Sequence, residues 1–536
     1  MPKCYNQLSE KHVFNKNLTF LYVSLKDMKK GIFILFFVFS QVILGQSNYQ
    51  LAEQYFRNSE YEKAVQLFEA LVKKNPSNTN YLKKLINSYQ EIGRFDTVET
   101  LLQERIQKNP KATYLFVEIG YNYARQQQQE LAKTYYDKAI ASIQTNPSMG
   151  GFMGYLFKEN ILLDYAITAY QTAMSFNPNL NYQFQVAQLY GEKGDFEKMF
   201  TSYVNLVAKN EHYANTVKRL TSRYINDDPE NSTNVLFKKA LLKKSVSNPK
   251  NVWNELLSWL FTQQNEFQKA LIQEKALYYR NSGNTRTILI LGKSAFDNNR
   301  YDTAKECFDF VIANSQSKEQ VLSADLQRIQ IAIATNQPAI EQLFETTFNT
   351  YGKSTATLQH QMAYANYLTY YKNKPQQAIA LLEAAKAIAA SKFEKAAIKI
   401  SLGDIYVFTG KYNRALVYFS QVQTGIKNHP LAQQARFKVA QTSYFKHDFK
   451  WATAQLKVLK SSTTQLIAND ALALFLILSD NQPKDSLNTG LKQYANADLL
   501  AFQNKDNQAI DSLQTLITKF KGQDIEDDGL YKLASI

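Results

Sequence analysis

The apolar, small and polar positions of this chain recur with a fixed period. Pro76, Pro110 and Pro178 lie 34 and twice 34 residues apart. Small and aromatic residues alternate in the same order in front of each proline, and before the first of them they are Ala52, Tyr55, Ala64 and Phe68. A period of this length indicates stacked units, each of which buries its apolar face against its neighbours.

The composition favours helices for these units. The 536 residues include only Gly 18 and Pro 11, about 3% and 2% of the chain, less than half the usual share of each. A fold with many tight turns would need more of both residues. We therefore expect an all-α chain.

The spacing resembles the tetratricopeptide repeat, a pair of antiparallel helices in 34 residues with small residues at positions 8, 20 and 27, aromatic residues at 11 and 24, and proline at 32. Further matches include Gly120 with Tyr136, and Gly154 with Tyr170. The resemblance implies a right-handed superhelical α-solenoid of about eleven tetratricopeptide-like helix pairs. The units begin at residues 45, 79, 113, 147, 180, 251, 285, 359, 396, 433 and 490, with one degenerate unit near 320–353.

Two interruptions of this register divide the chain. We expect an N-terminal array over 46–210, an atypical helical connector with one weak repeat over 211–284, a central and C-terminal array over 285–466, and final degenerate repeats over 467–536. Residues 226–232 in the connector are rich in helix breakers, so the solenoid is expected to change direction there. The chain stops inside a predicted first helix, which suggests a truncated end or a partner that covers it.

The N-terminus predicts export. Lys29 and Lys30 precede an apolar segment that ends at Gly45, about 14 residues long and too short to cross a bilayer. We expect a signal peptide over 28–45, no lipoprotein because no cysteine follows it, and a periplasmic or envelope location with no transmembrane helix in the mature chain. Residues 1–27 then represent a leader or a start assigned upstream of Met28. The alternative is an uncleaved signal anchor.

No pattern in the sequence indicates catalysis. The five histidines are far apart, and there is no His-Glu-x-x-His, Cys-x-x-Cys, phosphate-binding glycine loop or Gly-x-Ser-x-Gly elbow. We therefore expect no enzyme activity, no cofactor and no metal. Two cysteines cannot build a disulfide framework, and Cys307 is expected to be a small buried residue.

In the family that the chain resembles, positions 2, 5, 9, 12 and 13 of each first helix line a concave groove. The candidate groove residues in the N-terminal array are Lys83, Asn87, Tyr121, Arg125, Tyr155, Lys158, Phe184 and Gln188. This mixture suits an extended peptide with acidic or carboxylate groups, although a solvated helix face has the same composition. Lys83 and Asn87 resemble the start of a carboxylate clamp, but Glu118 and Phe152 depart from it, so no chaperone clamp is predicted.

These features favour a non-enzymatic exported scaffold for partner proteins or peptides, similar to exported multi-repeat tetratricopeptide proteins of Gram-negative bacteria. The chain is basic, with a formal net charge of +15. Export argues against nucleic acid as the partner. The basic connector keeps open a carrier or assembly factor for envelope polymer or lipid, and a regulatory subunit is a third possibility. The connector cations are Lys218, Arg219, Arg223, Lys238, Lys239, Lys243 and Lys244.

Overall fold

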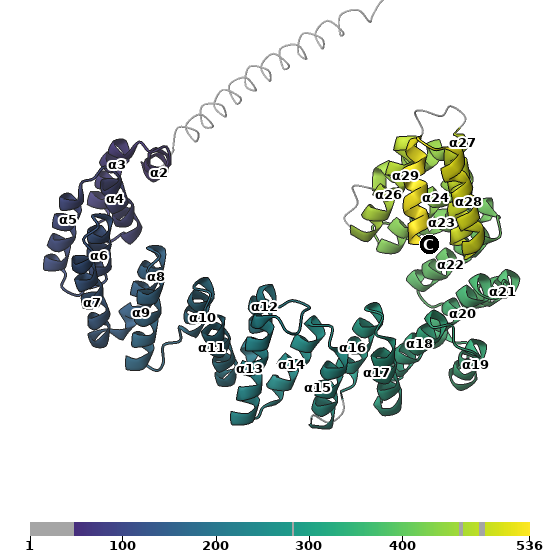
Figure 1. Cartoon of the computed structure of the whole chain (residues 1–536), viewed down its shortest axis with the longest axis horizontal. Coiled ribbons are helices and arrows are strands. Elements are labelled where there is room, and N and C mark those ends of the chain that lie inside the picture. The colour runs from purple at the N-terminus through teal and green to yellow at the C-terminus, as the bar shows by residue number, and fades with distance from the viewer. Residues whose placement is uncertain (1–47, 281–283, 460–464, 482–487) are drawn as a thin grey trace, which may run out of the picture. The chain divides into compact units, whose positions relative to one another are not determined.

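The computed structural model describes residues 48–280, 284–459, 465–481 and 488–536. Within these ranges the chain forms 28 α-helices and four short 3-10 helices, with no strand (Figure 1). The predicted all-α class is confirmed. The predicted leader and signal peptide lie outside the described residues. None of the described helices is both long and apolar enough to cross a membrane.

The helices form two compact units that divide after Pro249, except that Asp227–Pro229 cluster with the second unit. The helices of unit 1 are α2 Asn48–Arg57, α3 Tyr61–Lys74, α4 Thr79–Glu91, α5 Phe95–Lys108, α6 Leu115–Arg125, α7 Gln129–Thr145, α8 Gly150–Glu159, α9 Leu163–Phe176, α10 Gln183–Glu192, α11 Phe196–Lys209, α12 Ala214–Thr221 and α13 Ser232–Ser247.

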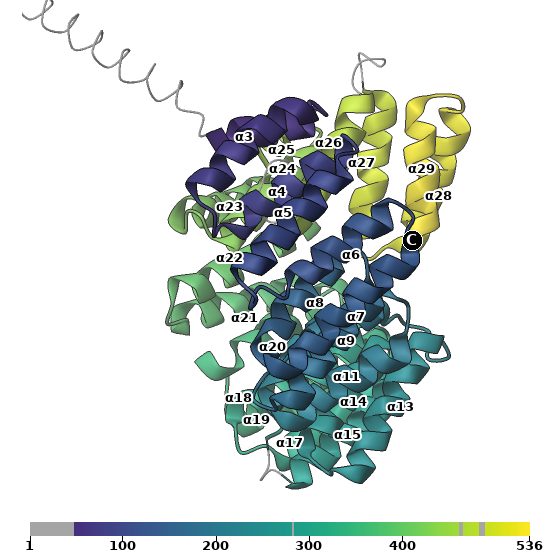
Figure 2. The same ribbon diagram turned by 90° about the vertical axis from the view of Figure 1, so that its left-hand side faces the viewer.

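Unit 2 continues the series. Its helices are α14 Asn251–Gln263, α15 Phe267–Arg280, α16 Arg286–Asp297, α17 Tyr301–Asn314, α18 Lys318–Ala334, α19 Ile340–Tyr351, α20 Leu358–Tyr370, α21 Pro375–Ile388, α22 Lys392–Phe408, α23 Tyr412–Gly425, α24 Pro430–Phe445, α25 Phe449–Leu459, α26 Gln465–Asn481, α27 Thr489–Phe502, α28 Asp506–Lys519 and α29 Asp524–Ser535. In both units, successive helices lie side by side in chain order (Figures 1 and 2).

The two helices of a pair approach closely where a small residue faces an aromatic ring. At four pairs a glycine at repeat position 8 lies against the aromatic residue at position 24, so that a Cβ on the glycine would come within 2.7 Å of the ring. Only glycine fits such an approach without a shift of its neighbour. These pairs are Gly120 with Tyr136, Gly154 with Tyr170, Gly292 with Phe308, and Gly403 with Phe419.

The turns between paired helices repeat one backbone conformation. In each of the eleven predicted units, and in the degenerate one, a residue of the inter-helix turn has positive φ. Glycine and asparagine, which tolerate this left-handed region best, occupy eight of the twelve turns. The twelve residues are Ser59, Gly93, Gln127, Ile161, Gly194, Asn265, Asn299, Asn336, Asn373, Gly410, His447 and Asn504. The repeat architecture is therefore confirmed.

Four helices stand outside these twelve pairs, namely α12 and α13 in unit 1 and α26 and α29 in unit 2. In unit 1, the short α12 is flanked by 3-10 turns at Glu211–Tyr213 and Ser222–Tyr224. This part of the sequence lacks the small residues of the repeat signature. In unit 2, α26 stands alone between the pairs α24 and α25, and α27 and α28. Cys307 is fully buried in α17, and burial raises the pKa of its thiol to about 12, so it is the inert small core residue that was predicted.

Candidate partner-binding groove

The first helices of three successive pairs, α4, α6 and α8, enclose a hollow of about 290 Å³ in unit 1. Figure 2 shows these helices following one another across unit 1. Their equivalent positions recur every repeat, so the three helices present their faces to the same side. The hollow is lined by Thr79, Asn80, Leu82, Lys83, Ile86, Tyr114, Leu115, Glu118, Phe152, Tyr155 and Leu156.

Three aromatic rings form one wall of this hollow. The ring of Phe152 lies edge-on to Tyr114, with 5.1 Å between the ring centroids, and stacks on Tyr155 at 6.4 Å. Tyr155 is 48% exposed although it is aromatic, because it stands at the rim. The lining therefore offers apolar and aromatic surface that an entering side chain could cover.

Glu118 is the buried polar group of the hollow. The residue is only 4% exposed, but its carboxyl oxygens, in the wall of the hollow, are not fully shielded from solvent. Burial raises the pKa of Glu118, and the charge of Lys83 opposes this rise. An occupant of the hollow would remove this carboxyl group from water, so a ligand that donates a hydrogen bond to it is favoured over one that does not.

The three predicted groove cations each have an acidic neighbour. The ion pairs are Lys83 Nζ with Glu159 at 3.6 Å, Arg125 Nη1 with Glu91 at 3.0 Å, and Lys158 Nζ with Glu192 at 2.8 Å. Two of these pairs join residues one 34-residue repeat apart. Because the pairs neutralise the cations, the expected attraction of these positions for an acidic peptide is weakened.

Only some of the candidate groove residues line the hollow. Lys83 and Tyr155 meet at the hollow, with Nζ 5.9 Å from the centre of the ring. Phe184, by contrast, packs against Tyr203 and Tyr213, at centroid distances of 6.2 and 5.4 Å. Asn87, Tyr121 and Gln188 are half-buried residues of α4, α6 and α10 that do not line the hollow.

The sequence interpretation missed Tyr114 as a wall of the hollow and treated Glu118 and Phe152 only as departures from a clamp. Glu118 and Phe152 both occupy position 6 of their repeats, beside the expected groove positions. The shared repeat position of this carboxylate and this aromatic residue is a feature of the sequence that could have indicated a common site.

The basic connector forms a second hollow in unit 1, of about 330 Å³, between α11 and α13. Lys243 and Lys244 line it together with Lys239. Lys239 lies 3.4 Å from Glu197, and Lys244 donates a hydrogen bond to Asn205 at 2.9 Å. The cationic character of this surface is therefore partly compensated.

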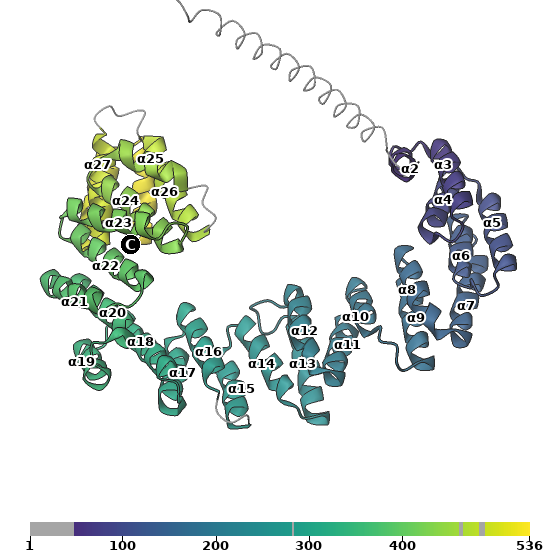
Figure 3. The ribbon, with the colours of Figure 1, turned by 180° about the vertical axis from the view of Figure 1, so that it is seen from behind.

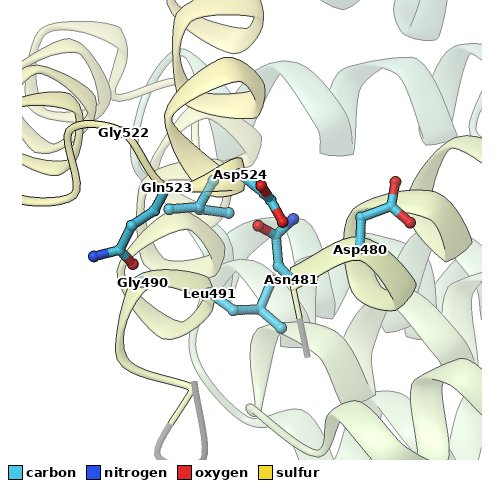
Figure 4. Close-up of a pocket in the computed structure, with 8 residues that line it drawn as sticks. Asp480, Asn481, Gly490, Leu491, Gly522, Gln523 and Asp524 are labelled. Carbon is cyan, nitrogen blue, oxygen red and sulfur yellow. The ribbon is translucent and has the colours of Figure 1, made fainter. Parts of the chain in front are cut away.

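A third hollow, of about 270 Å³, lies in unit 2 where α26, α27 and α29 meet (Figure 4). Asp480 and Asp524 are the acidic residues in its lining. Asp524 belongs to the first turn of α29, where carboxylates favourably oppose the partial positive charge of a helix start. Within the described residues, no group of three or more side chains is placed to hold a metal ion.

In unit 2, the C-terminal end of α27 contacts the last residues of three first helices. Gln503 Nε2 donates a hydrogen bond to the backbone oxygen of Phe408 at 2.8 Å, across 95 residues. The ring of Phe502 lies 5.9 Å from Tyr370 and 5.5 Å from Phe445, measured between centroids. The end of α27 thus packs onto α20, α22 and α24, and Figure 3 shows the C-terminal helices gathered around one another.

Comparisons with known proteins agree with a helical repeat architecture. The family model described as the TT21 fifth ARM repeats domain matches residues 46–145, which span α2 to α7. No curated protein matches the chain.

The chain also matches several solved structures, at low sequence identity and low TM-scores. One is yeast Tom70, at 14% sequence identity and a TM-score of 0.35, over 80% of this chain and 94% of that chain. Another is the APC/C hetero-tetramer Cut9-Hcn1, at 13% sequence identity and a TM-score of 0.30, over 92% of this chain and 98% of that chain. A third is Naa15/Naa10 bound to HypK-THB, at 13% sequence identity and a TM-score of 0.27, over 91% of this chain and 78% of that chain.

Proposed function

We propose that this chain, a helical repeat protein of the tetratricopeptide type, is a non-enzymatic scaffold that binds an extended segment of a partner protein along α4, α6 and α8. The observation that carries this proposal is the aromatic hollow at these helices, which contains the buried Glu118. Packing requirements account for the small residues of the repeat, but they do not account for a carboxyl group in the wall of an aromatic hollow.

The geometry favours a segment over a compact ligand. The lining residues come from three successive repeats, so a bound chain would meet side chains of α4, α6 and α8 in turn. In unit 2, Phe502 and Gln503 contact the last residues of α20 and α22.

Site-specific photo-crosslinking tests the proposal. Benzoylphenylalanine replaces Tyr155 in α8, or Phe176 at the end of α9 as the control, because the two rings are equally exposed at 48% and 50%. We expect discrete protein adducts from position 155 that are absent from position 176. Each captured protein is then added in purified form to the full chain and to Tyr155→Ala, and binding should weaken about tenfold or more in the variant. Identical adducts at both positions would contradict the assignment of the groove.

We further propose that the chain is exported to the periplasm or envelope. Support comes from Lys29 and Lys30 followed by the short apolar segment that ends at Gly45. N-terminal sequencing of the protein isolated from envelope fractions tests this. A first residue near Gln46 is expected, whereas an intact N-terminus at Met28 would favour the signal anchor.

A second candidate function is a carrier for an anionic envelope polymer or lipid. The lysine-lined hollow between α11 and α13 favours it, together with Leu242 and Val246, which are exposed on the same helix. Flotation with vesicles that contain anionic lipid tests this function. Binding that Lys243→Glu abolishes would support it, and binding that is equal for neutral vesicles would exclude a role for the lysines.

A further inference from the structure

The hollow at α4, α6 and α8 has the size and lining for one large side chain. A cavity of about 150 Å³ accommodates a benzene molecule, and this hollow is roughly twice as large, at 290 Å³. Leu82, Ile86 and Leu156 provide aliphatic surface in the same lining as the aromatic residues Phe152 and Tyr155. Filling such a surface removes apolar area from water, which is the usual source of affinity at an anchor position.

The hollow also constrains the polar part of that side chain. Glu118 is largely buried, but its carboxyl oxygens retain contact with solvent, so a purely aliphatic occupant of the hollow would shield them from water without supplying a hydrogen bond. A donor on the occupant would satisfy it. Specificity of this kind is strong because the analogue that lacks the donor leaves a buried acceptor without a partner.

Lys83 argues against a cationic occupant. Its ammonium group already lies 5.9 Å from the centre of the Tyr155 ring and 3.6 Å from Glu159, and its charge acts on Glu118. A lysine or arginine side chain entering the hollow would meet this like charge at close range. An acidic side chain would meet the carboxyl group of Glu118 and the paired Glu159. A neutral donor avoids both conflicts.

We propose that this hollow is an anchor pocket for a tyrosine or tryptophan side chain of a partner segment, with the ring against Phe152 and Tyr155 and its O–H or N–H donated to Glu118. The proposal rests on the function proposed above and specifies the chemistry of the partner. It requires an aromatic residue that carries a donor, and phenylalanine or leucine should be inferior at the same position.

Selection from a displayed library of random 12-residue peptides tests this proposal. The full chain, Glu118→Leu and the control Glu192→Leu serve as separate targets; Glu192 lies at the groove but is exposed and paired with Lys158. We expect tyrosine or tryptophan at one fixed position among peptides selected on the parent and on the Glu192 variant. On Glu118→Leu, phenylalanine or leucine should replace them.

Affinity measurements complete the test. Tyr→Phe or Trp→Phe at the anchor of a selected peptide should weaken binding to the parent about tenfold, as expected for one lost hydrogen bond, and leave binding to Glu118→Leu nearly unchanged. Glu118→Gln, which keeps an acceptor and fits the same space, should retain the tyrosine or tryptophan preference. Thermal melts of each variant establish that it is folded.

The possible failures are distinguishable. Selected peptides that compete at Tyr155 but carry phenylalanine, leucine or a charged anchor would overturn the anchor proposal while leaving the groove in place. Selection of tyrosine or tryptophan on Glu118→Leu would also overturn the anchor proposal and leave the groove in place. Absence of any enriched peptide, or peptides whose binding is indifferent to Tyr155→Ala, would overturn the proposed function itself.

Discussion

Gly403 of α22 faces Phe419 of α23 so closely that a Cβ on the glycine would lie 2.9 Å from Cδ1 of the ring and closer still to two other ring atoms. Gly403→Ala should therefore destabilise unit 2 by about 1–3 kcal/mol through overpacking. The matched control is Gly425→Ala at the end of α23, where a Cβ would meet nothing within 4 Å. That change should be neutral or slightly stabilising in chemical denaturation. Equal stability of the two variants would refute the close helix contact.

Ile161 is the β-branched residue among the twelve inter-helix turns, with φ of 60° and 81% of its surface exposed. A branched side chain in the left-handed region is strained by about 1 kcal/mol or more, and the exposed position offers little packing in return. Ile161→Gly should raise the free energy of unfolding by about 1 kcal/mol. Gly93→Ile places the same side chain at the equivalent turn of another repeat and should lower stability by a similar amount. A decrease in stability for Ile161→Gly would instead point to contacts that the strained turn serves.

Asp404 and Lys438 form a largely buried ion pair, with 3.1 Å between Oδ1 and Nζ and about a fifth of each side chain exposed. Burial raises the pKa of Asp404, although Lys438 opposes the shift. Lys438→Met should cost roughly 3 kcal/mol because it leaves the carboxylate buried without its cation. Asp404→Asn in the same chain should restore most of that loss.

A more exposed pair provides the comparison for this prediction. Lys158 and Glu192 are each about 40% exposed, so Lys158→Met should cost less than about 1 kcal/mol. Urea denaturation of the single and double variants measures these differences. If the two lysine variants lost equal stability, burial would not be the factor that distinguishes the pairs.

Glu118 should make stability depend on pH in a definite direction. Because its pKa is raised in the folded protein, the folded state binds the proton more tightly than the unfolded state does. The stability that this proton contributes is present below the ordinary carboxyl pKa of about 4.3, and it is lost as pH rises through the raised value. Glu118→Gln should therefore differ little from the parent near pH 4 and become relatively more stable towards pH 7. Paired denaturation curves at several pH values measure this difference, and a difference that shrank with rising pH would contradict the burial of Glu118.

The repeat could be predicted because its packing needs recur at fixed positions. Gly154 and Tyr170 lie 16 residues apart in the sequence and touch across one helix pair, as do Gly292 and Phe308 in unit 2. A contact within one repeat depends on local spacing alone, so one chain suffices to recognise it. The positive φ at each inter-helix turn follows from the same register.

The packing of α27 onto α20, α22 and α24 could not be predicted in this way. Gln503 meets Phe408 across 95 residues because small rotations between successive helix pairs accumulate along the array. The sequence pattern of a single repeat does not determine the accumulated rotation. The contact places the end of α27 against the last residues of three first helices of unit 2.

The candidate site was only partly visible in the sequence for a related reason. Lys83 and Tyr155 were identified from their repeat positions, but the sequence does not show that Lys83 reaches Glu159 two repeats away. The pairing of Arg125 with Glu91 did leave a signal, namely opposite charges one repeat apart. Glu118 could not be recognised as buried, because the hollow that it lines is formed by residues of three successive repeats.

The central claim is that partner segments bind along the first helices of unit 1, and hydrogen–deuterium exchange tests it most directly. The full chain is compared with and without a saturating peptide from the selection described above. We predict slower exchange in residues 79–91, 114–125 and 150–159, with unit 2 and α13 unchanged. Protection confined to α13 or to unit 2, with none in α4, α6 and α8, would contradict the claim.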